Sequence, residues 1–285
     1  MSRPDRPFTL GAVAYDAKVV TIWDGFLRFF EDRGLPFDYI LYTNYESQVE
    51  AHFAGHLDVA WNSPLAWVET ERVCAQRGRR AEAIAMRDSD QDLTSVILTR
   101  AGSGISTSAD LRGKVVAVGA GDSPQATLIP LLHLADESGL TPHEEFEVQR
   151  HDLLVGKHGD HIGGERDAVK ALLAGKADAA CILDANHLGF TREGTLAAGQ
   201  TEVLTQTPAF DHCNFTVLDD APAEQVARFK ELLLAMSYDD PEVRPLLDLE
   251  GLKQWREGRV SGYAQLEQAV DRFGYLDAWL ARMAR

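Results

Sequence analysis

Short apolar runs alternate with amphipathic segments along most of the chain. The apolar runs are rich in strand-forming residues and cover residues 8–15, 38–43, 57–61, 82–86, 114–119 and 177–183, and a further strand is expected near 147–151. The segments between them place apolar residues at helical spacing and cover residues 19–33, 46–54, 64–76, 125–137 and 165–174. Strands that alternate with helices are typical of α/β proteins with largely parallel sheets.

One nine-residue pattern occurs twice in this alternation. "FAGHLDVAW" at 53–61 and "LAGKADAAC" at 173–181 share the order apolar, Ala, Gly, polar, apolar, Asp, apolar, Ala, apolar. In each copy we expect the glycine to end a helix in the left-handed conformation and the run after it to form a buried strand. Because the copies fall in separate halves of the chain, the repeat predicts two lobes of similar design.

The predicted fold class is therefore α/β with two lobes, each a mostly parallel sheet flanked by helices. The first lobe is expected to combine residues 1–100 and 208–285, and the second to cover residues 101–207. Two crossover strands, near 95–104 and 203–216, are expected to join them. Ligands of open α/β sheets bind beyond the carboxyl ends of the strands, so we expect a small molecule to bind there, between the lobes.

Composition narrows the choice of partners and cofactors. A net charge of −16 and a pI near 4.9 argue against a nucleic-acid partner, because phosphate backbones attract a surplus of Lys and Arg. The three cysteines are widely spaced and predict neither a disulfide framework nor a zinc site. His158, His161 and Glu165 could be considered as metal ligands, but their glycine-rich spacing fits no zinc signature. We therefore expect no cofactor and no metal.

The amino-terminal segment bears on the location of the protein. Its apolar stretch is short and leads directly into an expected strand, and no run is long enough to span a membrane. We expect no membrane insertion, and a cytoplasmic location for the chain as written. A periplasmic or extracellular location follows if an export signal was removed or missed.

Three segments together resemble a known family. "GHLDVAWNSPLAWV", "SADLRGKVVAVGAGDSPQATLIPLLHL" and "ERDAVKALLAGKADAACI", in this order and spacing, resemble phosphonate/phosphite-type solute-binding proteins of ABC importers. The resemblance covers roughly residues 8–235. It implies the type II periplasmic-binding-protein fold, in which two α/β lobes are joined by two crossover strands and the ligand lies at the hinge between them.

The chain departs from that family at two positions. The resemblance implies a Ser-Thr-Ser-Gly loop after a strand of the second lobe, where this chain has Ser123, Pro124, Gln125 and Ala126. Proline donates no N–H to an anion. Glu165 falls where the resemblance implies a histidine, and a carboxylate there repels a dianion. Phosphate, phosphite and simple alkylphosphonates are therefore expected to bind poorly, and the ligand to be another small polar anion or a zwitterion.

The candidate ligand-binding residues follow expected strands or begin expected helices. They are Tyr15, Lys18, Asn62, Ser63, Ser123, Gln125, His161, Glu165, Asp184 and Asn186. Structural roles remain open for some of them, since Ser63 suits a helix cap and Lys18 a solvated helix start. His212 and Cys213 are adjacent on an expected strand and should point to opposite faces, so we expect no nucleophile–base pair from them.

Two functions from different classes fit these patterns. The first is the substrate-binding protein of an ABC-type importer, with a small molecule and a transporter permease as partners, as a monomer or weak dimer. The second is a cytoplasmic enzyme on the same fold, a lyase, decarboxylase or biosynthetic enzyme acting on a small carboxylate or heterocycle. The effector half of a transcription regulator is disfavoured because the sequence shows no helix-turn-helix segment.

Overall fold

The computed structural model describes residues 6–15, 17–152 and 161–284, without the side chains of residues 161–163. The chain forms two compact α/β units. Unit 1 comprises Met1–Gln91, Asp211–Tyr263 and Leu276–Arg285, and unit 2 comprises Asp92–Phe210 and Ala264–Tyr275. No helix among the described residues is both long enough and apolar enough to cross a membrane.

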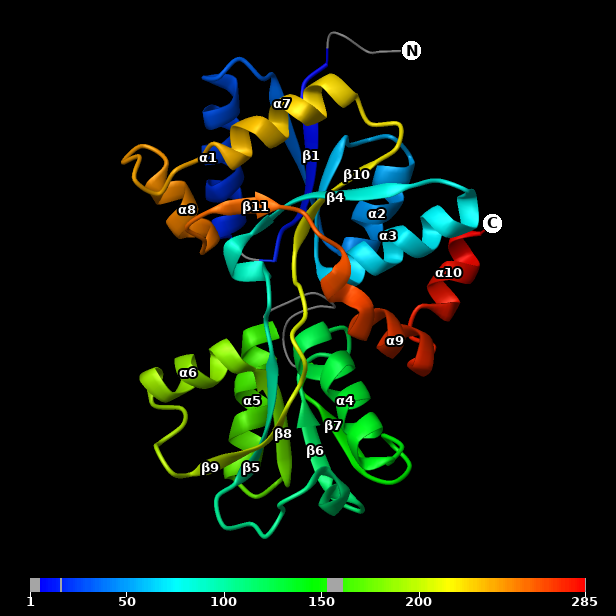
Figure 1. Cartoon of the computed structure of the whole chain (residues 1–285), viewed down its shortest axis with the longest axis vertical. Coiled ribbons are helices and arrows are strands. Elements are labelled where there is room, and N and C mark those ends of the chain that lie inside the picture. Colours follow the sequence, from blue (N-terminus) through cyan, green and yellow to red (C-terminus); the bar gives the residue numbers. More distant parts are fainter. Residues whose placement is uncertain (1–5, 16, 153–160, 285) are drawn as a thin grey trace. The chain divides into compact units, whose positions relative to one another are not determined.

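Unit 1 holds a six-stranded sheet in the order β11-β4-β10-β3-β1-β2 (Figure 1). Its elements are β1 (Phe8–Val13), α1 (Lys18–Glu31), β2 (Phe37–Tyr42), α2 (Tyr45–Phe53), β3 (Val59–Asn62), α3 (Pro64–Arg77), β4 (Ala81–Arg87), η1 (Asp88–Asp90), β10 (Asn214–Leu218), α7 (Ala223–Leu234), α8 (Arg244–Glu250), β11 (Trp255–Glu257), η4 (Ser261–Tyr263) and α10 (Asp277–Met283). Strands β1 to β4 share one direction, because β1 is parallel to β2 and β3 while β10 is antiparallel to both β3 and β4.

Unit 2 holds a five-stranded sheet in the order β7-β6-β8-β5-β9. Its elements are β5 (Ser95–Arg100), η2 (Ser108–Leu111), β6 (Val115–Val118), η3 (Pro124–Leu128), α4 (Ile129–Ser138), β7 (Glu147–Arg150), α5 (His161–Leu173), β8 (Ala179–Leu183), α6 (Asp184–Glu193), β9 (Thr201–Gln206) and α9 (Ala264–Phe273). Strands β6, β7 and β8 are parallel, and β5 runs antiparallel to β8 and β9.

The predicted two-lobe α/β fold class is confirmed, with two differences in detail. Both sheets are mixed rather than mostly parallel, because β10 and β5 each run against their neighbours. The predicted lobe boundaries also differ from the observed units. The expected first lobe includes β5 and α9, but β5 pairs within the sheet of unit 2 and α9 packs against α4 of that unit. An apolar run identifies a strand but does not say which sheet will pair with it.

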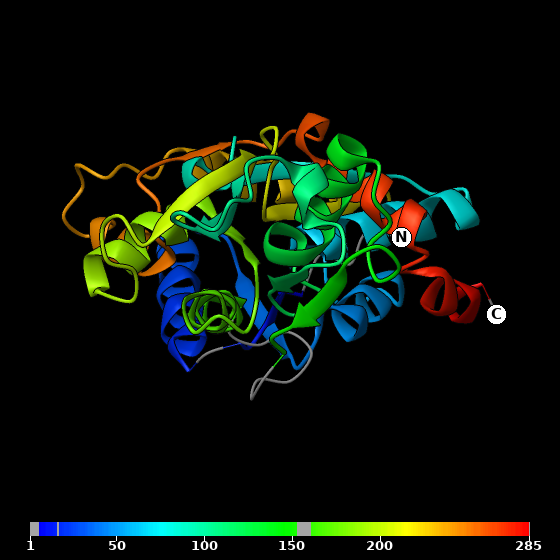
Figure 2. The ribbon, with the colours of Figure 1, turned by 90° about the horizontal axis from the view of Figure 1, so that it is seen from below.

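Each sheet is covered by helices on both faces, as alternating strand residues show. In β8, Ala180 and Ile182 pack in a core with α5, whereas Ala179 and Cys181 pack in a core with α4 (Figure 1 and Figure 2). In β3, Val59 and Trp61 join the aromatic core beneath α1, α7 and α8, and Ala60 faces the other side. Strands buried on both faces read as continuous apolar runs, which is the pattern in the sequence.

The structure assigns a common role to the aspartate of the nine-residue repeat. Gly55 and Gly175 have φ values of +74° and +70° and end α2 and α5 as expected. The Asp58 carboxylate accepts from the N–H of Thr9 at 2.9 Å, and its own N–H donates to the Thr9 carbonyl at 2.8 Å. Asp178 exchanges the same two hydrogen bonds with Val115, at 3.0 and 2.7 Å.

The two aspartates therefore close the amino edges of the two sheets, where a neighbouring parallel strand begins. An arginine accompanies each of them. Arg6 forms an ion pair with Asp58, and Arg100 lies 3.8 Å from Asp178. The repeat recurs because each unit must provide partners for the same backbone groups at the start of a strand, which is a structural requirement.

Replacement of Asp58 by alanine should destabilise the fold. The Thr9 N–H then loses its acceptor in a buried setting, and we expect the free energy of unfolding to fall by about 2–3 kcal/mol. Asp38→Ala on the exposed face of β2 is the matched control and should change it by no more than about 0.5 kcal/mol. Urea denaturation followed by circular dichroism measures both. Equal effects of the two substitutions would show that the Asp58 contact contributes nothing specific.

His52, on α2 beside this contact, makes stability depend on pH. Burial lowers its pKa from 6.5 to about 4, against opposing effects of Asp220 and of a hydrogen bond with the Asp58 backbone. The folded state thus disfavours the charged imidazole. The stabilisation is complete above about pH 6.5 and is lost as the pH falls towards about 4.

Unfolding measured between these pH values should therefore separate the parent from His52→Gln. As the pH falls over this range, the free energy of unfolding of the parent should decrease by up to about 3 kcal/mol more than that of the variant. His56→Gln, in the exposed turn that follows, is the control and should behave as the parent does. Parallel pH profiles for the parent and His52→Gln would contradict the assignment.

Candidate functional site

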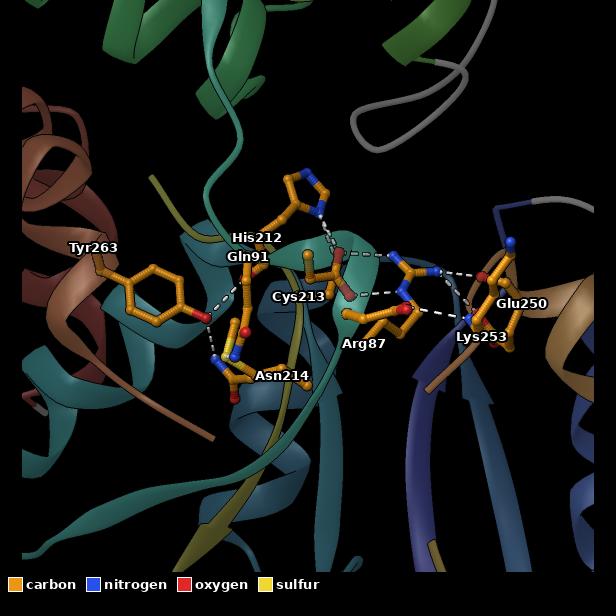
Figure 3. A network of polar contacts seen from close by, with 11 residues as sticks. Arg87, Gln91, His212, Cys213, Asn214, Glu250, Lys253 and Tyr263 are labelled. Atoms are coloured by element: carbon orange, nitrogen blue, oxygen red, sulfur yellow. Dashed lines mark hydrogen bonds and ion pairs between the residues drawn. The ribbon is translucent and has the colours of Figure 1, made fainter. Parts of the chain in front are cut away.

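A charged cluster lies at the carboxyl edge of the sheet in unit 1. Because β10 runs opposite to β3 and β4, the residues just before it lie where those two strands end. This places His212 and Cys213 close to Arg87, the last residue of β4, and to Asp90 of η1. Glu250, at the end of α8, completes the cluster (Figure 3).

Arg87 holds this cluster together. Its Nε and Nη2 donate to the two carboxylate oxygens of Asp90 at 2.5 and 2.9 Å. Its Nη1 donates to Glu250, to Oε2 at 3.0 Å and to the backbone carbonyl at 2.8 Å. The guanidinium also lies over the Trp61 ring, 5.2 Å from its centroid. Because its charge is paired with two carboxylates, the Arg87 side chain can be ionised although only 18% of it is exposed.

The two carboxylates of the cluster respond differently to burial. Burial alone raises the pKa of Asp90, but the adjacent Arg87 charge and hydrogen bonds from Arg87 and His212 outweigh it and lower the pKa to about 2. At Glu250 burial prevails over the attraction of Arg87, so its pKa is raised. Asp90 is therefore the permanent counter-charge of Arg87.

The expectation that His212 and Cys213 point apart is wrong. His212 Nδ1 lies 3.1 Å from Cys213 Sγ and 3.4 Å from Asp90 Oδ1. The strand begins only at Asn214, so the alternation of strand side chains does not apply to these two residues. Burial raises the pKa of the Cys213 thiol well above its ordinary value, which is the opposite of an activated nucleophile.

A chain of hydrogen bonds supports the cluster from beneath. Each side chain donates to the next, at 2.6–2.9 Å, and the last donates to the His212 carbonyl at 2.7 Å. The members are, in order, Gln48, Asn62, Thr216, Asn214 and Tyr263. All five are buried, so the chain fixes the start of β10 from α2, β3 and η4.

The unit 1 residues that the sequence nominated fall into two groups. Asn62 is fully buried within the hydrogen-bond chain, and Ser63 caps α3 by accepting from the Ala66 N–H at 3.2 Å. Tyr15 follows β1 and is 45% exposed, and the Lys18 ammonium lies 5.8 Å from the centroid of its ring. The Asn62 amide thus makes hydrogen bonds within the fold, while Tyr15 and Lys18 are exposed to solvent.

A second polar cluster lies at the carboxyl edge of the sheet in unit 2. Glu165 is fully buried there, and its Oε2 accepts from the Leu183 N–H and from Asn186 Nδ2, both at 2.8 Å. Gln125 Nε2 lies 3.4 Å from the other oxygen. The carboxylate therefore joins the end of β8, α6 and η3.

The N-terminus of η3, a turn of π-helix, uses its backbone donors within unit 2. The Ala126 N–H donates to Ser123 Oγ at 3.2 Å, and the N–H groups of Thr127 and Leu128 donate to the Ser123 carbonyl at 3.1 Å. Pro124 has no N–H to offer. Gln125 Oε1 is buried and has no hydrogen-bond partner among the described residues.

The structure thus brings together four nominated residues of unit 2, Ser123, Gln125, Glu165 and Asn186. Asp184 begins α6 and is half-buried. His161 begins α5, and its side chain lies outside the described part of the structure. A ligand-binding role for these residues stays a prediction.

Sequence reasoning missed Arg87, Asp90, Glu250 and Tyr263. A signal existed for the first two, because the polar run "RDSDQD" at 87–92 follows an apolar strand at the edge where ligands bind. Glu250 and Tyr263 are distant in sequence and lie in segments without a distinctive pattern.

A family model described as "ABC transporter, phosphonate, periplasmic substrate-binding protein" matches residues 10–263. Solved structures share the fold. PhnD1 of Prochlorococcus marinus, in complex with methylphosphonate, is 17% identical with a TM-score of 0.67, covering 94% of this chain and 98% of its own. XAC2383 of Xanthomonas citri, bound to ATP, is 15% identical with a TM-score of 0.71, covering 94% and 98%.

The phosphonate-transporter binding protein of Pseudomonas aeruginosa is 14% identical with a TM-score of 0.62, covering 98% of this chain and 97% of its own. At these identities the structures establish the fold. The family match confirms the resemblance found in the sequence and supports a small-ligand-binding protein. The alternative of an enzyme gains no support from the comparisons.

The hydrogen-bond chain generates a prediction for Asn62. Asn62→Ala leaves Gln48 Nε2 without one of its two acceptors and Thr216 without a donor, so the free energy of unfolding should fall by about 2–3 kcal/mol. Ser63→Ala, which removes only a helix cap, should cost about 1 kcal/mol. Urea denaturation of both variants tests this. An Asn62 variant as stable as the parent would show that this series of hydrogen bonds does not support β10.

Proposed function

Because the chain belongs to the family of periplasmic phosphonate substrate-binding proteins of ABC transporters, we propose that it binds a small zwitterion rather than a simple phosphonate. It is a small-ligand-binding protein, and the polar cluster at the carboxyl edge of each sheet is, taken by itself, a surface we propose for ligand contact. The pair of Gln125 and Glu165 is the observation that carries the choice of ligand class.

An anion gains little at the edge of unit 2. Anions bind helix N-termini through unpaired backbone N–H groups, but three of those in η3 already have partners within the unit. The buried carboxylate of Glu165 lies beside them and repels a dianion. Gln125 Oε1, in contrast, is a buried acceptor that a ligand N–H can satisfy.

The charge balance in unit 1 points the same way. Arg87 donates from Nε, Nη1 and Nη2 to Asp90 and Glu250, so its guanidinium is already occupied. The pKa of Asp90 is lowered and that of Glu250 is raised, so Asp90 carries the firmer negative charge. A cationic ligand group is therefore compatible with this edge.

Periplasmic location and delivery to a transporter permease are part of this proposal. They rest on the family match. Cell fractionation with an antibody against the chain tests the location directly, and recovery in the cytoplasmic fraction would contradict it.

The ligand class can be tested by calorimetry. Phosphate, phosphite and methylphosphonate should each bind the parent protein more weakly than about 1 mM. Glu165→Gln removes the buried charge while keeping a hydrogen-bonding side chain, and should improve methylphosphonate binding at least about tenfold. Glu147→Gln, exposed on β7, is the matched control and should leave it unchanged. Micromolar binding of any of the three anions by the parent would refute the proposal.

Binding of a zwitterion supplies the positive test. A thermal-shift panel of small zwitterions, including free amino acids, should contain a compound that raises the melting temperature. Its affinity should fall at least about tenfold in Gln125→Met, which removes the buried acceptor. Gln206→Met on exposed β9 is the control. A ligand whose affinity is equal in parent and Gln125→Met would place the binding surface elsewhere.

A further inference from the structure

We propose that Asp90, His212 and Cys213 form a binding site for a divalent metal ion of borderline softness, such as Zn²⁺. The three residues offer a carboxylate oxygen, an imidazole nitrogen and a sulfur, and these atoms lie within 4.8 Å of one another. They all belong to unit 1, and His212 and Cys213 are labelled in Figure 3. Oxygen, nitrogen and sulfur donors of these types are the usual ligands of Zn²⁺.

The spacing of the three atoms suits a single ion. Bonds of about 2.0–2.3 Å in a tetrahedral arrangement separate neighbouring ligand atoms by about 3.3–3.7 Å. His212 Nδ1 lies 3.4 Å from Asp90 Oδ1 and 3.1 Å from Cys213 Sγ. Small rotations of the side chains therefore bring all three within bonding distance of one ion, with a fourth position open.

The ligands are held in place before any ion binds. The His212 N–H donates to the Asp90 carbonyl at 2.8 Å, which fixes the two segments against each other. Arg87 holds the Asp90 carboxylate at 2.5 and 2.9 Å, and Tyr263 donates to the His212 carbonyl at 2.7 Å. Partners that orient a ligand in this way are a regular feature of metal sites.

The charges of the cluster also balance around a divalent ion. When the sulfur–metal bond forms, the Cys213 thiol gives its proton to solvent. Asp90, Glu250 and the thiolate then carry three negative charges, against one on Arg87 and two on the ion. Neutrality matters because the donors from Asp90 and Cys213 are buried. His212, 22% exposed, gives solvent access to the ion.

Titration of the purified, chelator-treated protein with Co²⁺ tests the site. Thiolate coordination should produce a sulfur-to-cobalt charge-transfer absorption that saturates at one ion per chain and is displaced by Zn²⁺. Cys213→Ser and Cys213→Ala should abolish this absorption. His212→Asn should keep it but weaken Co²⁺ binding at least about tenfold.

Two matched controls separate this site from other thiols and imidazoles. Cys74→Ala and His56→Asn should bind Co²⁺ as the parent does, and circular dichroism verifies that each variant is folded. Absence of the charge-transfer absorption at millimolar Co²⁺ would overturn the proposal. So would its survival in a folded Cys213 variant or its loss in Cys74→Ala. If neither Cys213 variant folds, a Co²⁺ affinity of His212→Asn equal to that of the parent would also overturn the proposal.

Discussion

Burial of the Glu165 carboxylate constrains the whole carboxyl edge of unit 2. A carboxylate removed from water needs hydrogen-bond donors, and Glu165 obtains them from the end of β8, from α6 and from η3. The same contacts set the positions of Gln125 and Asn186, and they place the Glu165 side chain beside the N-terminus of η3. The side chains around the N-terminus of η3 are therefore arranged by their contacts with Glu165, and not by contacts with a bound anion.

Polar groups at the amino and carboxyl edges of each sheet obtain their hydrogen-bond partners in different ways. At the amino edges, Asp58 and Asp178 exchange hydrogen bonds with the backbone of a neighbouring strand and leave those groups satisfied. At the carboxyl edges, Arg87 pairs with Asp90 and Glu250 in unit 1, and Glu165 accepts from Asn186 and from the Leu183 N–H in unit 2. Gln125 Oε1, which is buried and has no hydrogen-bond partner among the described residues, is the group that we propose meets a ligand.

The elements of the fold could be predicted because local rules govern them. Apolar runs and helical spacing located the strands and helices, and the glycines of the repeat ended α2 and α5 as expected. The pairing of β5 and the placement of α9 could not be predicted, because they depend on contacts between segments far apart in sequence.

The same limit applies to the candidate sites. Ser123, Gln125, Glu165 and Asn186 can be nominated from the sequence because each stands at a recognisable strand or helix end, and the structure brings them together. Asn62 was nominated on the same ground, yet its amide is occupied by Gln48 and Thr216, which the sequence gives no reason to connect. The association of Arg87 with Glu250 likewise arises only because the last residue of α8 meets the last residue of β4 in the fold.

The central claim is that internal contacts at the carboxyl edges select a ligand with a cationic group and no phosphonate dianion. Native mass spectrometry of the protein incubated with a metabolite extract, followed by release and identification of the bound molecule, tests it most directly. The account predicts a small nitrogen-containing zwitterion without phosphorus. Recovery of a phosphonate or a phosphate monoester as the bound species would contradict it.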